Sequence, residues 1–228
     1  MVAVMHIIMI TDNQISLFKL LQVSSPSLPV GAYSYSQGLE WAVECGWVTD
    51  ATSFRQWLKE QLTGTITQQD LPLFLRMYYA CESANVSALT YWDAMALAMR
   101  ETSELRHEEL QRGRATALLL EKFGIDSSGV QSQIAALAVY CVKENITVSD
   151  SMAGYAYSWL DSQVTAGIKL VPVGQSEGQL ILYTFSGLLK DSIATAQVIP
   201  DDEIGYSSPA LSIASSLHET QYCRLFRS

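Results

Sequence analysis

Residues with metal-binding or nucleophilic chemistry are sparse and widely spaced in this chain. Its three histidines, His6, His107 and His218, belong to no H-E-x-x-H motif, and none of its four cysteines belongs to a C-x-x-C pair. A zinc site would have to be assembled from distant positions. His218 and Cys223 lie five residues apart, and they would share a metal ion only if the C-terminal segment folds suitably. We therefore expect this chain to bind no metal.

Serine and carboxylate groups leave one enzymatic alternative open. Gly31-Ala-Tyr-Ser34 does not form the G-x-S-x-G elbow of serine hydrolases, and no strand is predicted before it. Asp201-Asp202-Glu203 is similar to the aspartate-rich motif of helical prenyl-transferring enzymes, but Gly205 replaces the next aspartate, so an exposed acidic turn is favoured. The sequence also lacks a G-x-x-x-x-G-K-[ST] loop for nucleotide phosphates. We expect no catalytic residue and no bound cofactor, with a small all-α hydrolase or transferase as the alternative.

Composition narrows the class of partner. The net charge of −9 disfavours nucleic acid, whose phosphates an acidic chain repels. Apolar residues make up 49% of the chain and charged residues only 16%, which indicates that partner proteins cover part of the surface. Scattered cysteines fit a reducing cytoplasm. The apolar start, MVAVMHIIMI, is too short to cross a bilayer, so no membrane is expected. An acidic helical regulator of some other system also fits these observations.

Apolar residues recur at helical spacing along almost the whole chain, and alternating strand patterns are nearly absent. Start signals include Asp50, Asp70 followed by Pro72, and Ser208 followed by Pro209. The pattern predicts a single all-α domain over residues 1–228, a bundle of about eight to ten helices. We expect residues 1–13 to form an N-terminal arm and residues 218–228 to form a partner-binding tail.

A stiff polar and aromatic loop interrupts the helices early in the chain. Residues 25–40 read SPSLPVGAYSYSQGLE, in which Pro26 and Pro29 must end the first helix. Gly31 accepts backbone angles that other residues avoid. Tyrosines and serines held by such a loop lose little freedom on binding, which suits a recognition surface. An ordinary helix–helix connector is the alternative.

Three further segments stand out. Residues 100–114, RETSELRHEELQRGR, predict the helical ion pairs Arg100–Glu104 and Glu108–Arg112. Residues 166–179, AGIKLVPVGQSEGQ, place Lys169 at a helix C-terminus, where the helix dipole favours a cation. The C-terminal segment, HETQYCRLFRS, is amphipathic and carries arginine and aromatic side chains, which are enriched at interfaces.

These four segments together resemble the UreF family of urease accessory proteins. The loop follows the pattern S-P-x-L-P-[IV]-G-[GA]-[FY]-S-x-S-x-G-L-E, with Ala32 and Tyr33 at its variable positions. The charged segment is similar to R-E-T-x-E-L-R-x-E-E followed by a glycine, here Gly113. Residues 166–179 contain a match to the family pattern K-L-V-P-x-G-Q. The C-terminal segment resembles the family pattern H-E-x-x-Y-x-R-L-F-R-S. Residues 215–217 depart from the family, in which an arginine often precedes the histidine.

The resemblance implies an all-α homodimer that acts in nickel insertion into urease and is not itself an enzyme. Such a protein bridges the GTP-binding nickel chaperone UreG and the accessory protein UreD (also called UreH), docks on the urease apoprotein and modulates UreG GTP hydrolysis. Nickel and GTP would be handled by the partner complex. The tail would order on contact with UreD. The residues expected to contact partners are Pro29, Gly31, Tyr33, Ser34, Tyr35 and Lys169 for UreG, and His218, Tyr222, Arg224, Leu225, Phe226 and Arg227 for UreD.

Overall fold

The computed structural model describes residues 12–25, 27–206 and 208–227, and within these ranges it is helical with no strand. The predicted all-α class is confirmed. Of the predicted arm, residues 1–11 lie outside the described residues, and Asp12 already begins the first helix. The helices are α1 (Asp12–Ser24), α2 (Leu39–Glu44), α3 (Ala51–Gln61), α4 (Leu71–Glu82), α5 (Val86–Ala98), α6 (Ser103–Lys122), α7 (Gln133–Lys143), α8 (Val148–Leu170), α9 (Gln175–Ala196) and α10 (Pro209–His218), with the π-helical η2 (Leu62–Asp70) and the 3₁₀ turns η1 (Ala32–Ser34) and η3 (Asp201–Glu203).

Two of the predicted start signals act as expected. Asp50 accepts a hydrogen bond from the backbone N–H of Ser53 at 2.8 Å, and the Ser53 hydroxyl oxygen accepts one from the backbone N–H of Asp50, which completes a capping box for α3. Ser208 accepts a hydrogen bond from the backbone N–H of Leu211, and Pro209 occupies the first turn of α10. Both signals are local, which explains why the sequence alone sufficed.

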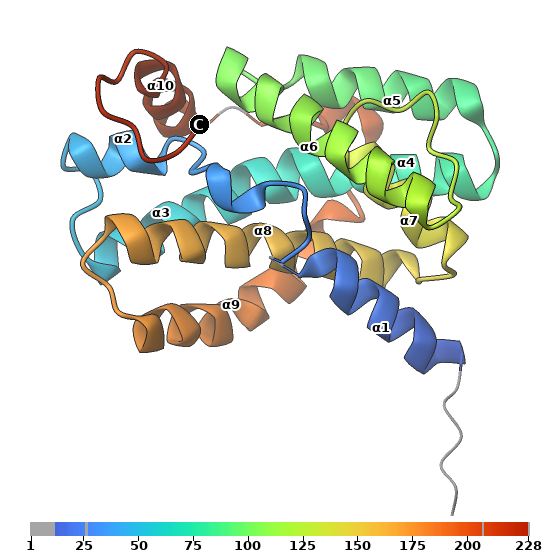
Figure 1. The fold of residues 1–228 in the computed structure, drawn as a ribbon, viewed down its shortest axis with the longest axis horizontal. Helices are drawn as coiled ribbons and strands as arrows, with labels where there is room; N and C mark the ends of the chain where they lie inside the picture. The colour runs from blue at the N-terminus through green and yellow to red at the C-terminus, as the bar shows by residue number, and fades with distance from the viewer. Residues whose placement is uncertain (1–11, 26, 207, 228) are drawn as a thin grey trace, which may run out of the picture.

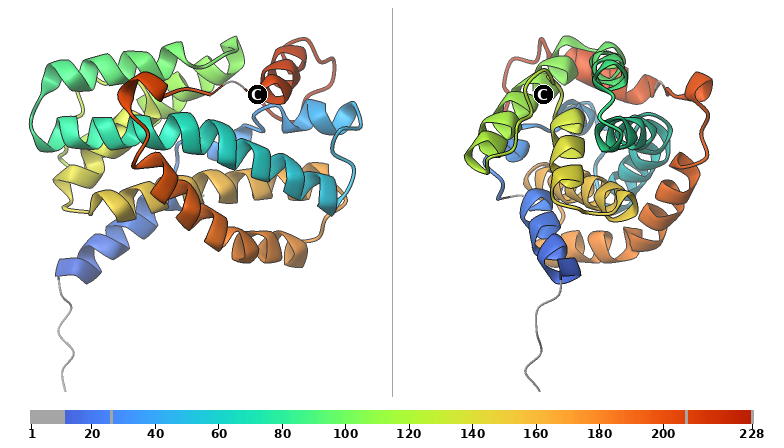
Figure 2. Two further views of the ribbon diagram at one scale, coloured as in Figure 1. Left: turned by 180° about the vertical axis from the view of Figure 1, so that it is seen from behind. Right: turned by 90° about the vertical axis from the view of Figure 1, so that its right-hand side faces the viewer.

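The prediction that Asp70 caps a helix is wrong. Helices α3, η2 and α4 run on without a break, as the long rod in the left view of Figure 2 shows, and Asp70 has helical backbone angles inside it. Its carboxylate instead pairs with Arg100. Pro72 lies in the first turn of α4, and the carbonyl oxygen of Gln68, four residues before it, accepts a hydrogen bond from the backbone N–H of Gly205 at 3.0 Å.

The core forms around α4, whose side chains Leu71, Leu73, Phe74 and Met77 have no exposed surface. Helix α4 packs on α5 and α7, while α8 packs on α9 and α1. Figure 1 shows α10 and the C-terminal segment lying over α2, far from α1. None of the helices within the described ranges is both long and apolar enough to pass through a membrane.

Candidate partner-binding surface

The four segments singled out in the sequence meet at one end of the fold. Helix α10 packs on α2 and α6, and α8 packs on η1 in the loop of residues 25–40. After α10, residues 219–227 turn back over α2 (Figure 1). The loop, the start of α6, the end of α8 and the C-terminal segment therefore share one surface, although they lie up to about 200 residues apart in the sequence.

Glu40 anchors the C-terminal segment to α2. Its two carboxylate oxygens accept hydrogen bonds from the backbone N–H groups of Leu225, at 2.6 Å, and Phe226, at 2.9 Å. The next residue, Arg227, donates its backbone N–H to the carbonyl oxygen of Ser34 in η1 at 2.7 Å. The segment is thus bonded to both the helix and the loop that precedes it.

His218 ends α10 with no exposed surface. Its Nε2 lies 3.1 Å from a carboxylate oxygen of Glu40, and its Nδ1 lies 2.7 Å from one of Glu104 in α6. The guanidinium of Arg224 donates to the second oxygen of Glu104 at 2.8 Å. In this arrangement His218 fixes the segment from inside and offers no surface to a partner. These bonds hold the segment against its own chain, and its ordering on contact with UreD stays a prediction.

Lys169 connects the loop and the C-terminal segment. Its Nζ lies 5.5 Å from the centre of the Phe226 ring and 6.0 Å from that of Tyr33, distances typical of cation–π contacts. Its predicted place at a helix C-terminus is confirmed, since it lies in the last turn of α8. Phe226 is buried, whereas Tyr33 is 41% exposed. A cation and an aromatic ring therefore stand side by side at the surface.

The other predicted contact residues divide by burial. Tyr35 is buried and so belongs to the core, while Ser34 is half-buried. Gly31 has a φ of +78°, as expected for a glycine that begins a tight turn. Exposed residues of the set are Pro29, Gly31, Tyr33, Lys169, Tyr222, Arg224, Leu225 and Arg227.

Comparison with known proteins decides the family. A sequence model of UreF matches residues 48–186. The urease accessory protein UreF of Alcanivorax borkumensis is 43% identical over 95% of this chain and its own full length. The chain belongs to the UreF family of urease accessory proteins. Two further relatives support this assignment. The urease accessory protein UreF of Pseudomonas putida is 44% identical over 95% of this chain and over its own full length. The UreF of Klebsiella pneumoniae is 45% identical over 92% of this chain and 96% of its own length.

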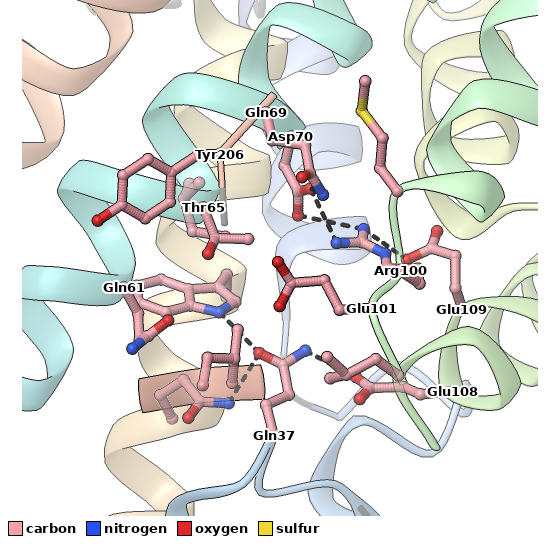
Figure 3. Close-up of a pocket in the computed structure, with 16 residues that line it drawn as sticks. Gln37, Gln61, Thr65, Gln69, Asp70, Arg100, Glu101, Glu108, Glu109 and Tyr206 are labelled. Carbon is pink, nitrogen blue, oxygen red and sulfur yellow. Dashed lines mark hydrogen bonds and ion pairs between the residues drawn. The ribbon is translucent and has the colours of Figure 1, made fainter. Parts of the chain in front are cut away.

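A buried ion-pair network lies beneath this UreF surface. Figure 3 shows the Arg100 guanidinium between the carboxylates of Asp70, at 2.9 Å, and Glu109, at 2.9 Å. Tyr155 donates its hydroxyl to Asp70 at 2.8 Å, and burial together with that carboxylate raises the pKa of the Tyr155 phenol. Although burial opposes the charge, Asp70 and Glu109 hold the pKa of Arg100 above its usual value.

The network corrects one predicted ion pair and confirms the other. Arg100 does not pair with Glu104, because α6 begins only at Ser103 and Arg100 lies before it. Arg112 donates to Glu108 at 2.8 Å as expected. Sequence reasoning missed Asp70 and Glu109 as partners of Arg100. The signal available was Asp70 itself, an acidic residue interpreted as a helix cap although it lies within a continuous helical stretch.

The cavity beside this network has a volume of about 40 Å³. Gln37 reaches it from the loop, accepts hydrogen bonds from Trp159 and Gln163, and donates one to Glu108 (Figure 3). Ligand pockets of enzymes have volumes of roughly 300–1,000 Å³, so this cavity has room for a few water molecules. Its polar groups connect the loop of residues 25–40 to α6 and α8 through hydrogen bonds.

The acidic, histidine and cysteine residues that the sequence offered for catalysis or metal binding do not form a common site in the part of the chain that the structure describes. Asp201 pairs with Arg76 of α4 at 2.8 Å, and residues 201–203 are exposed, which confirms the predicted acidic turn. Across the parts of the chain that the structure describes, no three His, Cys, Asp or Glu side chains gather closely enough to hold a metal ion. Both ring nitrogens of His218 face glutamates, and Cys223 points to solvent.

Thiol reactivity provides a direct check of this placement. Burial raises the pKa of Cys141 to about 11 and that of Cys81 to about 11, whereas Cys45 and Cys223 are exposed. We expect iodoacetamide at neutral pH to label Cys45 and Cys223 at least about ten-fold faster than the other two, because the thiolate is the nucleophile. Peptide mass spectrometry measures the rates, with the urea-unfolded chain as the control. Equal labelling of Cys141 and Cys223 would contradict the structure.

Proposed function

We propose that this chain is a non-enzymatic scaffold for nickel insertion into the urease apoprotein. It binds UreG and UreD (UreH), acts as a homodimer in the cytoplasm, and modulates GTP hydrolysis by UreG. Nickel and GTP are cargo and substrate of the assembled complex rather than cofactors of this chain. Membership of the UreF family supports the role in urease maturation.

The observation that carries the proposal is the convergence of the four segments on one surface. Tyr33 and Lys169 are assigned to UreG, and the exposed side chains of residues 222–227 to UreD. Aromatic and arginine side chains contribute strongly to binding when a partner covers them. Tyr222 is fully exposed and Leu225 is 66% exposed, so both are available to a partner without unfolding the segment.

A scaffold of this kind acts on GTP hydrolysis through differential affinity. If it binds one nucleotide state of UreG more tightly, it shifts UreG toward that state by the ratio of the two affinities. Nucleotide then changes scaffold binding by the same factor, because linkage is reciprocal. No catalytic group of this chain is required.

The UreG assignment predicts a loss of binding in Tyr33→Ala. We expect UreG co-purification to fall at least about ten-fold, since an interface aromatic contributes about 2 kcal/mol or more, while the helical circular dichroism is kept. The matched control is Tyr91→Ala, which removes an exposed tyrosine from α5 and should bind UreG normally. Undiminished UreG capture by Tyr33→Ala would remove the loop from the interface.

The UreD assignment predicts that the double variant Tyr222→Ala/Leu225→Ala loses UreD binding. This variant is sharper than deletion of residues 222–228, because it leaves the buried Phe226 ring in the core. We expect UreD affinity, measured by titration calorimetry, to fall at least about a hundred-fold. Leu118→Ala, which alters an equally exposed leucine on α6, is the control. Wild-type affinity in the double variant would show that UreD binds elsewhere.

A further inference from the structure

The connection between α9 and α10 lies against the rod formed by α3, η2 and α4, as the left view of Figure 2 shows. We call residues 199–206 of this connection the strap. At its start, the guanidinium of Arg76 in α4 donates hydrogen bonds to the carbonyl oxygen of Ile199 at 2.5 Å and to the Asp201 carboxylate at 2.8 Å. The side chains of Ile199 and Ile204 are buried in the hydrophobic core. The strap is therefore held by both polar and apolar contacts.

The end of the strap is bonded to η2. The N–H of Gly205 donates to the carbonyl oxygen of Gln68 at 3.0 Å. An α-helical carbonyl usually accepts from the N–H four residues ahead, but that residue here is Pro72, which has no N–H. Gly205 has a φ of +138°, a conformation that residues with side chains rarely adopt. A proline in the rod and a glycine in the strap thus favour the same hydrogen bond.

The closest packing between strap and rod is that of Tyr206 on Gly64. A Cβ atom on Gly64 would lie 2.3 Å from Cε1 of the Tyr206 ring and 2.8 Å from its Cδ1. The ring therefore rests directly on the backbone of η2, although Tyr206 remains 43% exposed. Two residues later, Ser208 caps α10, and its hydroxyl oxygen accepts a hydrogen bond from the side-chain amide of Gln61 at 3.3 Å.

These contacts follow one another in order along both partners. As the chain runs from Ile199 toward Ser208, the residues that it meets on the rod fall in number, in the order Arg76, Gln68, Gly64 and Gln61. The strap thus runs antiparallel to the rod over about 22 Å, at a rise of about 1.5 Å per helical residue. It ends where α10 begins.

We infer that Tyr206 is a positioning residue. By packing on Gly64, it fixes the point at which α10 begins, and so places the C-terminal segment within reach of its partner. The contacts described above involve no residue beyond Ser208, so the strap acts whatever conformation the segment after α10 takes. A fixed starting point shortens the free chain that must be ordered on binding, which raises affinity. The inference rests on the proposed function for the identity of the partner, UreD.

The decisive variant is Gly64→Ala, whose methyl group would occupy the place of the Tyr206 ring. The matched control is Gly187→Ala in α9, where an added Cβ meets nothing within 4 Å. We expect the amide of Gly205 to exchange with deuterium at least about ten-fold faster in Gly64→Ala. We also expect its affinity for UreD, measured by titration calorimetry, to fall about ten-fold. The control should leave both quantities unchanged.

Two variants of Tyr206 identify the ring as the cause. Tyr206→Phe keeps the ring and should match the unmodified chain, whereas Tyr206→Ala should speed exchange at Gly205 and weaken UreD binding as Gly64→Ala does. Adding Gly64→Ala to Tyr206→Ala should have no further effect, because both changes remove the same contact. Additive effects in the double variant would overturn the inference. Since Tyr206 is exposed and lies outside the helices, its variants provide the test if Gly64→Ala does not fold.

The outcomes separate this inference from the proposed function. Unchanged exchange at Gly205 in Tyr206→Ala would overturn the ring as the contact that holds the strap. Faster exchange with unaltered UreD affinity, while Tyr222→Ala/Leu225→Ala still weakens UreD, would overturn the positioning role but leave the scaffold intact. If Tyr222→Ala/Leu225→Ala keeps its affinity for UreD, the assignment of the C-terminal segment to UreD falls, and the inference falls with it.

Discussion

Replacement of Arg100 by methionine should destabilise the fold by about 3–5 kcal/mol, the cost of removing one partner from a buried ion pair. Methionine retains much of the side-chain volume but removes the charge. It would leave the Asp70 and Glu109 carboxylates, 3% and 6% exposed, without their guanidinium. Urea unfolding followed by circular dichroism measures the free energy of unfolding. The loss would be a large fraction of the about 5–15 kcal/mol by which domains are typically stable.

The control for this experiment is Arg55→Met. Arg55 pairs with Glu177 at 2.6 Å, but their side chains are 29% and 35% exposed. Pairs of this kind contribute about 0–1 kcal/mol. If Arg100→Met costs no more than Arg55→Met, the network of Asp70, Arg100 and Glu109 does not stabilise the packing of η2 near α6.

A single added methyl group at Gly113 should destabilise the fold by about 1–3 kcal/mol. A Cβ atom there would lie 2.0 Å from the carbonyl oxygen of Gln131 and 2.8 Å from the carbonyl carbon of Ser132. Both are backbone atoms, so no side-chain rotation relieves the overlap, and α6 would have to move away from the start of α7. Thermal or urea unfolding of Gly113→Ala tests this directly.

Gly187→Ala provides a control of opposite sign. Gly187 lies inside α9, and a Cβ atom there would meet nothing within 4 Å. Alanine in an unobstructed helix interior is expected to stabilise by about 0.5–1 kcal/mol relative to glycine. Equal effects at the two positions would show that helix propensity, and not the close approach of α6 and α7, determines the response.

Gly113 illustrates how the family patterns combine two kinds of residue. In the charged segment, Gly113 and Arg100 stabilise the fold, whereas Glu104 bonds to the C-terminal segment. In the C-terminal segment itself, Phe226 is buried and Tyr222 is exposed. Experiments that delete whole segments would therefore mix stability with binding, which is why the binding variants Tyr33→Ala and Tyr222→Ala/Leu225→Ala change exposed side chains alone.

The sequence by itself determined the helical class, the end of the first helix before Pro26, and the caps at Asp50 and Ser208. It also identified the family, through four segments that resemble the family's patterns, and a relative that is 43% identical agrees. These features depend on residues within a few positions of one another, and such interactions can be read from spacing alone. The predicted contacts with UreG and UreD remain proposals, since they involve other chains.

Only the tertiary structure decided which partners the charged side chains take. Asp70 and Arg100 lie thirty residues apart, and Glu40 and Leu225 lie 185 apart. No periodicity predicts such pairs, because they form where packed helices happen to bring side chains together. The same cause placed His218 in the interior, between glutamates of α2 and α6, although the sequence resemblance implied a contact with UreD at this residue. Burial depends on what packs over a residue, and that comes from distant parts of the chain.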